Sequence, residues 1–139
     1  MLSIGINSHT KPSEYQLLEF PQPEITDQTD VLIKVHAASI GYDAAGAVTA
    51  PGPGVTRFRV GDAVYVRLPE SHRGAWTEFA VCPERFIALK PPSLSFDKAA
   101  TMPLAAMTAY QVLKKYDSDL SGKTVFVPAG LGGTGLFAC

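Results

Sequence analysis

The chain has 139 residues, which is enough for one domain with a hydrophobic core but leaves little for a second. Hydrophobic residues make up 46% of it and charged residues 18%, a composition that excludes disordered and fibrous proteins. The formal net charge of −1 provides no general attraction to nucleic acid or to an anionic membrane, so neither is expected as a partner.

Two features of the sequence bear on the cellular compartment of the protein. Residues 1–11 lack a basic leader followed by an apolar run, and no later segment approaches the roughly 18 apolar residues of a membrane span. The two cysteines, Cys82 and Cys139, are too few for a disulfide framework or a structural zinc cage. We therefore expect a cytoplasmic protein with a buried thiol at Cys82 and an incidental one at Cys139.

The first part of the chain has the pattern of short strands. Proline, glycine, aspartate and serine clusters separate the apolar segments. The predicted strands lie in residues 2–7, 15–20, 30–40, 46–50, 62–68, 75–82 and 85–89. This pattern predicts a small barrel or sandwich of antiparallel strands.

The segment 30–40 alternates as a half-buried strand does. One side is predicted to carry the apolar side chains Val31, Ile33, Val35 and Ala37. Lys34 and His36 then lie on the other side. His36 is therefore interpreted as a solvent-facing strand residue and not as a ligand.

Two helices are predicted next. Ser95 can cap a short helix that runs through Ala100, and Pro103 can open a second helix that continues to residue 116. Four apolar residues of the second helix are expected to be buried: Leu104, Met107, Val112 and Leu113. Lys114 and Lys115 suit its C-terminal end.

A glycine-rich turn follows near the end of the chain. Residues 124–127, Thr-Val-Phe-Val, form an apolar run typical of a buried parallel strand. Gly130, Gly132 and Gly135 then give the pattern G-x-G-x-x-G. Such glycines allow a tight turn, close approach to a pyrophosphate and close packing of helix on strand, so the context favours a dinucleotide site.

Four stretches occur in the same order as in a known superfamily: residues 54–65, 72–81, 95–110 and 122–135. In them the chain resembles the medium-chain dehydrogenase/reductase superfamily, and within it the zinc-independent quinone oxidoreductase-like, enoyl reductase-like branch, in a shortened form. The resemblance implies a mainly β GroES-like barrel in residues 1–94. It further implies linking helices and the first strand and turn of a truncated α/β Rossmann domain in residues 95–139.

The resemblance also implies an activity and a cofactor. Such a protein would reduce quinones, enones or enoyl thioesters by hydride transfer from NADPH, and no catalytic residue is assigned. The implied cofactor-binding residues are Thr108, Gly130, Leu131, Gly132, Gly133, Thr134 and Gly135. Thr108 would lie near the nicotinamide, although it can equally be an ordinary helix residue. Tyr42 stands where zinc-dependent relatives carry a histidine ligand, which implies a metal-free site.

The chain departs from this family between Ile40 and Gly41, where an apparent deletion removes a loop and helix. Residues 31–50 would otherwise form one strand of roughly 65 Å, far beyond a normal length. Gly41 alone cannot close a standard hairpin, which needs about two loop residues. We therefore expect a bend, with residues 38–44 irregular relative to the family barrel.

A second departure is the ending, because only four residues follow Gly135. The ribose-binding residue of a dinucleotide fold lies about 20 positions after the glycines, so NAD and NADP cannot be distinguished and the chain alone is expected to hold NADPH weakly. Alternatives to the oxidoreductase are a non-catalytic GroES-like binding or oligomerisation module, or half of a split enzyme completed by a Rossmann-type chain. An unstable product without a role is the simplest alternative to all three.

Overall fold

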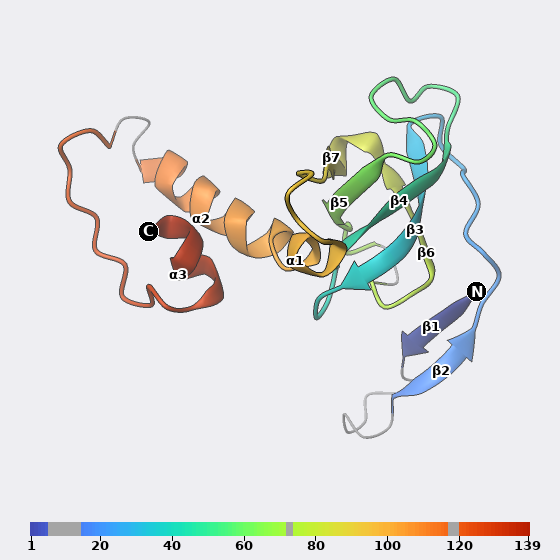
Figure 1. Ribbon diagram of the computed structural model, residues 1–139, viewed down its shortest axis with the longest axis horizontal. Coiled ribbons are helices and arrows are strands. Elements are labelled where there is room, and N and C mark those ends of the chain that lie inside the picture. The colour runs from blue at the N-terminus through green and yellow to red at the C-terminus, as the bar shows by residue number, and fades with distance from the viewer. Residues whose placement is uncertain (6–14, 72–73, 117–119) are drawn as a thin grey trace. The chain divides into compact units, whose positions relative to one another are not determined.

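The computed structural model describes residues 1–5, 15–71, 74–116 and 120–139. Its contacts divide the chain into two compact units, Met1–Thr101 and Met102–Cys139. Figure 1 shows strands in the first unit and mainly helices in the second. Among the described residues, no helix is long and apolar enough to cross a bilayer.

An antiparallel sheet of five strands forms the body of the first unit (Figure 1). Its strands in chain order are β3 (Asp30–Ala38), β4 (Asp43–Pro51), β5 (Ala63–Arg67), β6 (Phe79–Pro83) and β7 (Ile87–Leu89). They lie in the order β6-β3-β4-β5-β7, and a 3₁₀ turn at Glu84–Phe86 links β6 to β7. The predicted antiparallel, mainly β architecture is confirmed.

A separate two-stranded ribbon is formed by β1 (Leu2–Gly5) and β2 (Gln16–Glu19), which pair antiparallel. The ribbon is tied to the chain just before β6. The Ile4 amide donates to the Trp76 carbonyl over 2.9 Å, and the Glu78 amide donates to the Leu2 carbonyl over 3.1 Å. These two bonds hold β1, at the N-terminus, against the residues that precede β6.

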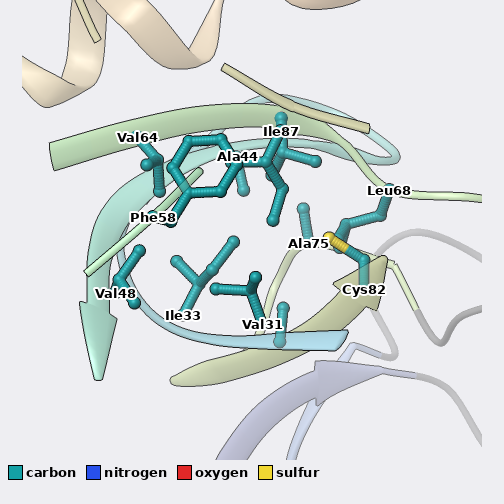
Figure 2. Close-up of a cluster of buried hydrophobic side chains, with 12 residues drawn as sticks. Val31, Ile33, Ala44, Val48, Phe58, Val64, Leu68, Ala75, Cys82 and Ile87 are labelled. Atoms are coloured by element: carbon teal, nitrogen blue, oxygen red, sulfur yellow. The ribbon is translucent and has the colours of Figure 1, made fainter. Parts of the chain in front are cut away.

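The main core of the first unit is a cluster of 12 buried apolar residues (Figure 2). They are Val31, Ile33, Ala44, Val48, Phe58, Val64, Val66, Leu68, Ala75, Ala80, Cys82 and Ile87. Figure 2 shows side chains of β3, β4 and β5 pointing toward one another inside the curved sheet. Burial of each large aliphatic side chain contributes about 1.5–3 kcal/mol, so this cluster is the main source of stability in the first unit.

A smaller cluster lies where the short helix α1 (Phe96–Ala100) packs on the sheet. Ala99 and Ala100 of the helix contact Ala45 of β4. The helix begins after Ser95, as predicted, and the Ser95 hydroxyl donates to Asp97, which lowers the pKa of that carboxyl. Because of these contacts α1 belongs to the first compact unit, which ends at Thr101, whereas the resemblance places a domain boundary at residues 94/95.

Strand β3 follows the predicted alternation over most of its length and then breaks it. Val31, Ile33 and Val35 face the main core, but Ala37 packs against the smaller cluster instead. The pairing shifts between Val35 and Ala37, which leaves His36 as the extra residue of a β-bulge. The prediction for Ala37 is therefore wrong, because a bulge changes the side of the sheet to which the following side chains point.

His36 is exposed, as predicted, but it is not isolated in solvent. Its ring stacks on Phe96 of α1 with 4.5 Å between the ring centroids and 20° between the planes. His36 therefore links the bulge in β3 to the helix.

The chain bends between β3 and β4 at residues 39–42. Gly41 has φ of 103°, a left-handed conformation that favours glycine, and its carbonyl accepts from the Ala75 amide over 3.0 Å. The Ser39 amide donates to the Asp43 carbonyl over 3.0 Å and closes the hairpin. The expected bend is present, but Ala38 and Asp43 are regular strand residues, so irregularity across all of 38–44 is not found.

The second unit contains α2 (Pro103–Tyr116) and α3 (Gly133–Ala138), which contact each other (Figure 1). Helix α2 begins at Pro103 and carries Lys114 and Lys115 in its last turn, as predicted. The predicted burial is wrong for three residues, since the exposed fraction is 47% at Leu104, 43% at Met107 and 49% at Val112. Leu113 is half-buried, and Ala109 is the buried residue in the middle of the helix.

Residues 124–127 do not form the predicted strand. Phe126 is 86% exposed and Val125 48% exposed. A parallel strand needs hydrogen-bonded neighbours and covered faces, and the described part of the second unit contains no other strand to supply them. The apolar pattern of this segment is typical of a strand, but residues 102–116 and 120–139 contain no neighbouring strand with which it can pair.

Candidate functional site

The glycine-rich turn leads into helix α3, which begins at Gly133 with Gly132 in the N-cap position. The Gly132 amide donates to the Ala129 carbonyl over 2.9 Å, and the Leu136 amide donates to the Gly132 carbonyl over the same distance. These bonds set the tight change of direction that the glycine pattern predicts. The turn and the helix of the predicted strand-turn-helix unit are thus present without the strand.

Among the glycines of this turn, Gly135 has the side-chain position that is sterically closed. A Cβ atom there would lie 1.9 Å from the carbonyl oxygen of Ala129. Real Cβ contacts are never that short, so no other residue fits without moving the turn. This is the close packing of helix on preceding chain that the third glycine of a dinucleotide fingerprint permits. The sequence could not identify Ala129 as the contact, because the turn brings it there.

The other residues of the turn are accessible. Leu131 is 93% exposed, and Gly132, Gly133 and Thr134 are also exposed. A Cβ atom at Gly133 would meet nothing within 4 Å. The backbone amides at the start of α3 can therefore be reached by an anionic group such as a pyrophosphate.

The helix behind the turn is short. Helix α3 has 6 residues, whereas isolated helices become marginally stable only at roughly 12–15 residues. The partial positive charge at the start of α3 comes from its aligned peptide dipoles, so it is present only while this turn and a half of helix stays formed. The turn therefore places open backbone amides at the start of a helix of a turn and a half.

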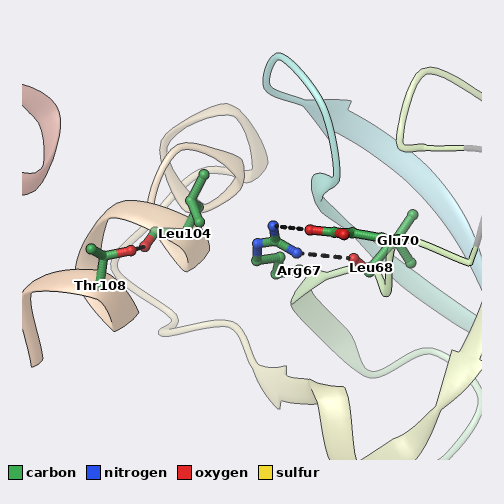
Figure 3. A network of polar contacts seen from close by, with 5 residues as sticks. All are labelled: Arg67, Leu68, Glu70, Leu104 and Thr108. Atoms are coloured by element: carbon green, nitrogen blue, oxygen red, sulfur yellow. Dashed lines mark hydrogen bonds and ion pairs between the residues drawn. The ribbon is translucent and has the colours of Figure 1, made fainter. Parts of the chain in front are cut away.

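Thr108 lies on α2, in the same unit as the turn, and is half-buried. Its hydroxyl donates to the Leu104 carbonyl one helical turn earlier over 2.7 Å (Figure 3). The oxygen keeps lone pairs that can accept a further hydrogen bond. Since α2 and α3 contact each other, the structure brings together the two helices that carry the predicted site residues.

Tyr42, in the first unit, occupies the position that the resemblance assigns to a histidine ligand in zinc enzymes. Its ring packs against the main core, and the Arg67 guanidinium carbon lies 5.6 Å from the ring centroid. Figure 3 shows the other contacts of Arg67, to the Leu68 carbonyl and the Glu70 carboxylate, each at 3.5 Å. Among the described residues no group of three or more His, Cys, Asp or Glu could hold a metal ion.

Cys82 is fully buried in the main core, which confirms the prediction of a buried thiol. Burial, together with the nearby Asp30, raises the pKa of Cys82 to about 12. A thiol with this pKa stays protonated at neutral pH and does not act as a nucleophile. Cys139 is exposed.

Comparison with known proteins identifies the relatives of the chain. The family described as "Alcohol dehydrogenase GroES-like domain" matches residues 28–92. The 2-methylene-furan-3-one reductase of tomato (Solanum lycopersicum) is 41% identical over 101 residues, which cover 68% of this chain and 26% of the reductase.

Solved structures match the whole fold. The quinone oxidoreductase from Coxiella burnetii has a TM-score of 0.88 and 29% sequence identity, over 99% of this chain and 51% of its own. A mycobacterial protein complexed with NADPH has a TM-score of 0.83 and 30% identity, over 99% of this chain and 48% of its own. The chain thus spans about half the length of each solved structure and about a quarter of the tomato reductase.

Proposed function

The chain belongs to the medium-chain dehydrogenase/reductase superfamily, and from that premise we propose that it serves an NADPH-dependent reduction of a quinone, enone or enoyl compound. The observation that carries the proposal is the glycine turn, in which Gly135 packs so closely on Ala129 that no side chain fits. The Coxiella burnetii relative is a quinone oxidoreductase, and the tomato relative is a 2-methylene-furan-3-one reductase.

The residues of the second unit would hold the cofactor. Gly130, Leu131, Gly132, Gly133, Thr134 and Gly135 would surround the pyrophosphate, and Thr108 would accept a hydrogen bond from the nicotinamide side. When bound, NADPH supplies the hydride, so the protein mainly orients it and excludes water. Tyr42 in place of a histidine ligand supports a reaction that uses no zinc.

The first experiment is a titration of the purified chain with NADPH that follows cofactor fluorescence and melting temperature together. Saturable binding with a rise in melting temperature is the expected result, because a ligand of the folded state stabilises it. A folded chain that binds no NADPH would contradict cofactor binding by this chain alone.

A pair of variants locates the binding. Gly135→Ala should weaken NADPH binding by at least about tenfold, because the new Cβ forces the turn away from Ala129. Leu136→Ala is the matched control, since this neighbouring side chain is 62% exposed and its loss leaves the turn unchanged. Equal binding by both variants would place the cofactor elsewhere.

One observation favours a second candidate function. The second unit exposes the large apolar side chains of Leu104, Met107, Val112 and Phe126, which a partner chain could cover. A Rossmann-type chain that covers them would complete a split enzyme, while the GroES-like part, which has its own core, would act as a binding or oligomerisation module if no cofactor is bound. A strictly monomeric chain that recovers no partner in pull-down would contradict this candidate.

A further inference from the structure

An open groove lies in the first unit, between the β1–β2 ribbon and the end of β3. Its volume is about 430 Å³, within the range of small-molecule sites. The apolar walls are formed by Leu2, Ile4, Leu17, Val35, Ala38 and Trp76. Every lining residue belongs to the first unit, so the groove does not depend on the glycine turn.

The polar groups of the walls are already engaged with one another. The Trp76 indole N–H donates to the Ser39 carbonyl over 2.8 Å, and the Ser3 hydroxyl donates to the Trp76 carbonyl over 2.9 Å. The Thr77 hydroxyl donates to the Phe79 carbonyl over 3.2 Å. The donor protons of these three groups are therefore used, so a ligand that needs to accept hydrogen bonds from them would have to break existing bonds, whereas an apolar ligand leaves them intact.

The charges of the groove also disfavour an ionic ligand. Of the described residues that line it, none is Lys or Arg, so a phosphate or a coenzyme A thioester would find no counter-charge. The Glu78 carboxylate accepts the Leu2 amide over 2.6 Å, and the His36 ring is stacked on Phe96. The Glu78 carboxylate lines the groove and repels an anion, so the lining favours a neutral molecule over an anionic one.

Trp76 provides an oriented aromatic surface. Its polar end is held by Ser39, and the Tyr15 ring packs edge-on against it with 5.5 Å between centroids. An indole fixed in this way loses little freedom when a flat ring contacts it. We propose that this groove binds a neutral, flat, apolar molecule of about the size of naphthalene. This site goes beyond the proposed cofactor function and can exist without it.

The groove can be tested through Trp76, which is the single tryptophan of the chain. The probe is N-phenyl-1-naphthylamine, a neutral dye that joins a naphthyl group to one further phenyl ring; its fluorescence rises in apolar surroundings and it accepts energy from tryptophan. Titration into the purified chain should give saturable dye emission on excitation of Trp76. Absence of saturable emission would overturn the proposal, whatever the result with NADPH.

Two exposed residues provide a matched pair of variants. Leu17→Glu places a carboxylate in the groove, at a side chain that is 69% exposed. Val60→Glu makes the same kind of change at a residue that is 67% exposed and does not line the groove. Leu17→Glu should weaken dye binding by at least about tenfold, because the carboxylate must lose water beside an apolar ligand, and Val60→Glu should leave it unchanged.

A third variant separates the groove from the apolar surface of the second unit. Phe126→Glu changes the 86% exposed ring of that unit and should leave dye binding unchanged. Melting temperatures of all variants show whether each folds. Loss of dye binding in Phe126→Glu, or equal binding in Leu17→Glu and Val60→Glu, would overturn the proposal.

Discussion

The two compact units differ in how their apolar residues are used. In the first unit, 12 apolar residues share one buried cluster inside a hydrogen-bonded sheet. In the second, Leu104, Met107, Val112 and Phe126 remain exposed, although their spacing suits burial. The difference shows that an apolar spacing buries side chains only where a second layer covers them.

The same contrast explains the state of the candidate site. The GroES-like unit has its own core, so its strands are held by contacts within residues 1–101. The glycine turn leads into a helix of 6 residues, and Gly135 of that helix packs closely on Ala129. Recognition of the family and stability of the site therefore rest on different parts of the chain.

The largest expected effect on stability comes from replacing a leucine by alanine, a change that can be made once in each unit. Leu68→Ala removes a fully buried side chain and should lower the free energy of unfolding by about 2–5 kcal/mol, a large part of a typical total. Leu104→Ala removes one that is 47% exposed and should cost less than about 0.5 kcal/mol. Urea unfolding followed by circular dichroism measures both. An equal cost at the two positions would show that the second unit is buried in solution.

The buried thiol of Cys82 should make the stability of the chain depend on pH above 9.0. The pKa of Cys82 is about 12 in the folded chain and 9.0 as its ordinary value, so the unfolded chain loses this proton first as pH rises. The contribution to stability is complete below pH 9.0 and is lost by up to about 1.4 kcal/mol per pH unit above it. Comparing the pH dependence of unfolding between the wild type and Cys82→Ala isolates this effect from other titrating groups.

A thiol reagent tests the difference in burial between Cys82 and Cys139. The folded chain should react once, at the exposed Cys139, and a second time only after unfolding. Cys139→Ser should abolish the first reaction. Rapid modification of Cys82 in the folded chain would contradict a closed core in the first unit.

The smallest expected effect concerns two glycines with positive φ. Gly41 (φ 103°) closes the β3–β4 hairpin, and Gly122 (φ 70°) lies in the second unit; a Cβ atom would meet nothing within 4 Å at either. Gly41→Ala should cost about 1–2 kcal/mol, because alanine is strained in this conformation. Gly122→Ala should change global stability less, since its surroundings can move. A neutral Gly41→Ala, measured by thermal melting, would show that the hairpin turn is not held as described.

Much of the first unit was predictable because its signals are local. Period-two alternation located the strands, Ser95 and Pro103 marked the starts of two helices, and the apolar pattern placed Val31 and Ile33 in the core. The glycine pattern likewise located the turn before α3. The roles of Thr108 and of the turn residues in cofactor binding stay predictions.

The sequence by itself determined the family, the strands and the turn, because propensities, caps and glycine spacing act over a few residues. Tertiary structure decided the bulge at His36, the exposure of Leu104 and the lack of a strand at residues 124–127. A bulge depends on the register of the partner strand, and burial depends on a covering layer. Neither a partner strand nor a covering layer is encoded in the segment that needs it, so the same apolar pattern is buried in one unit and exposed in the other.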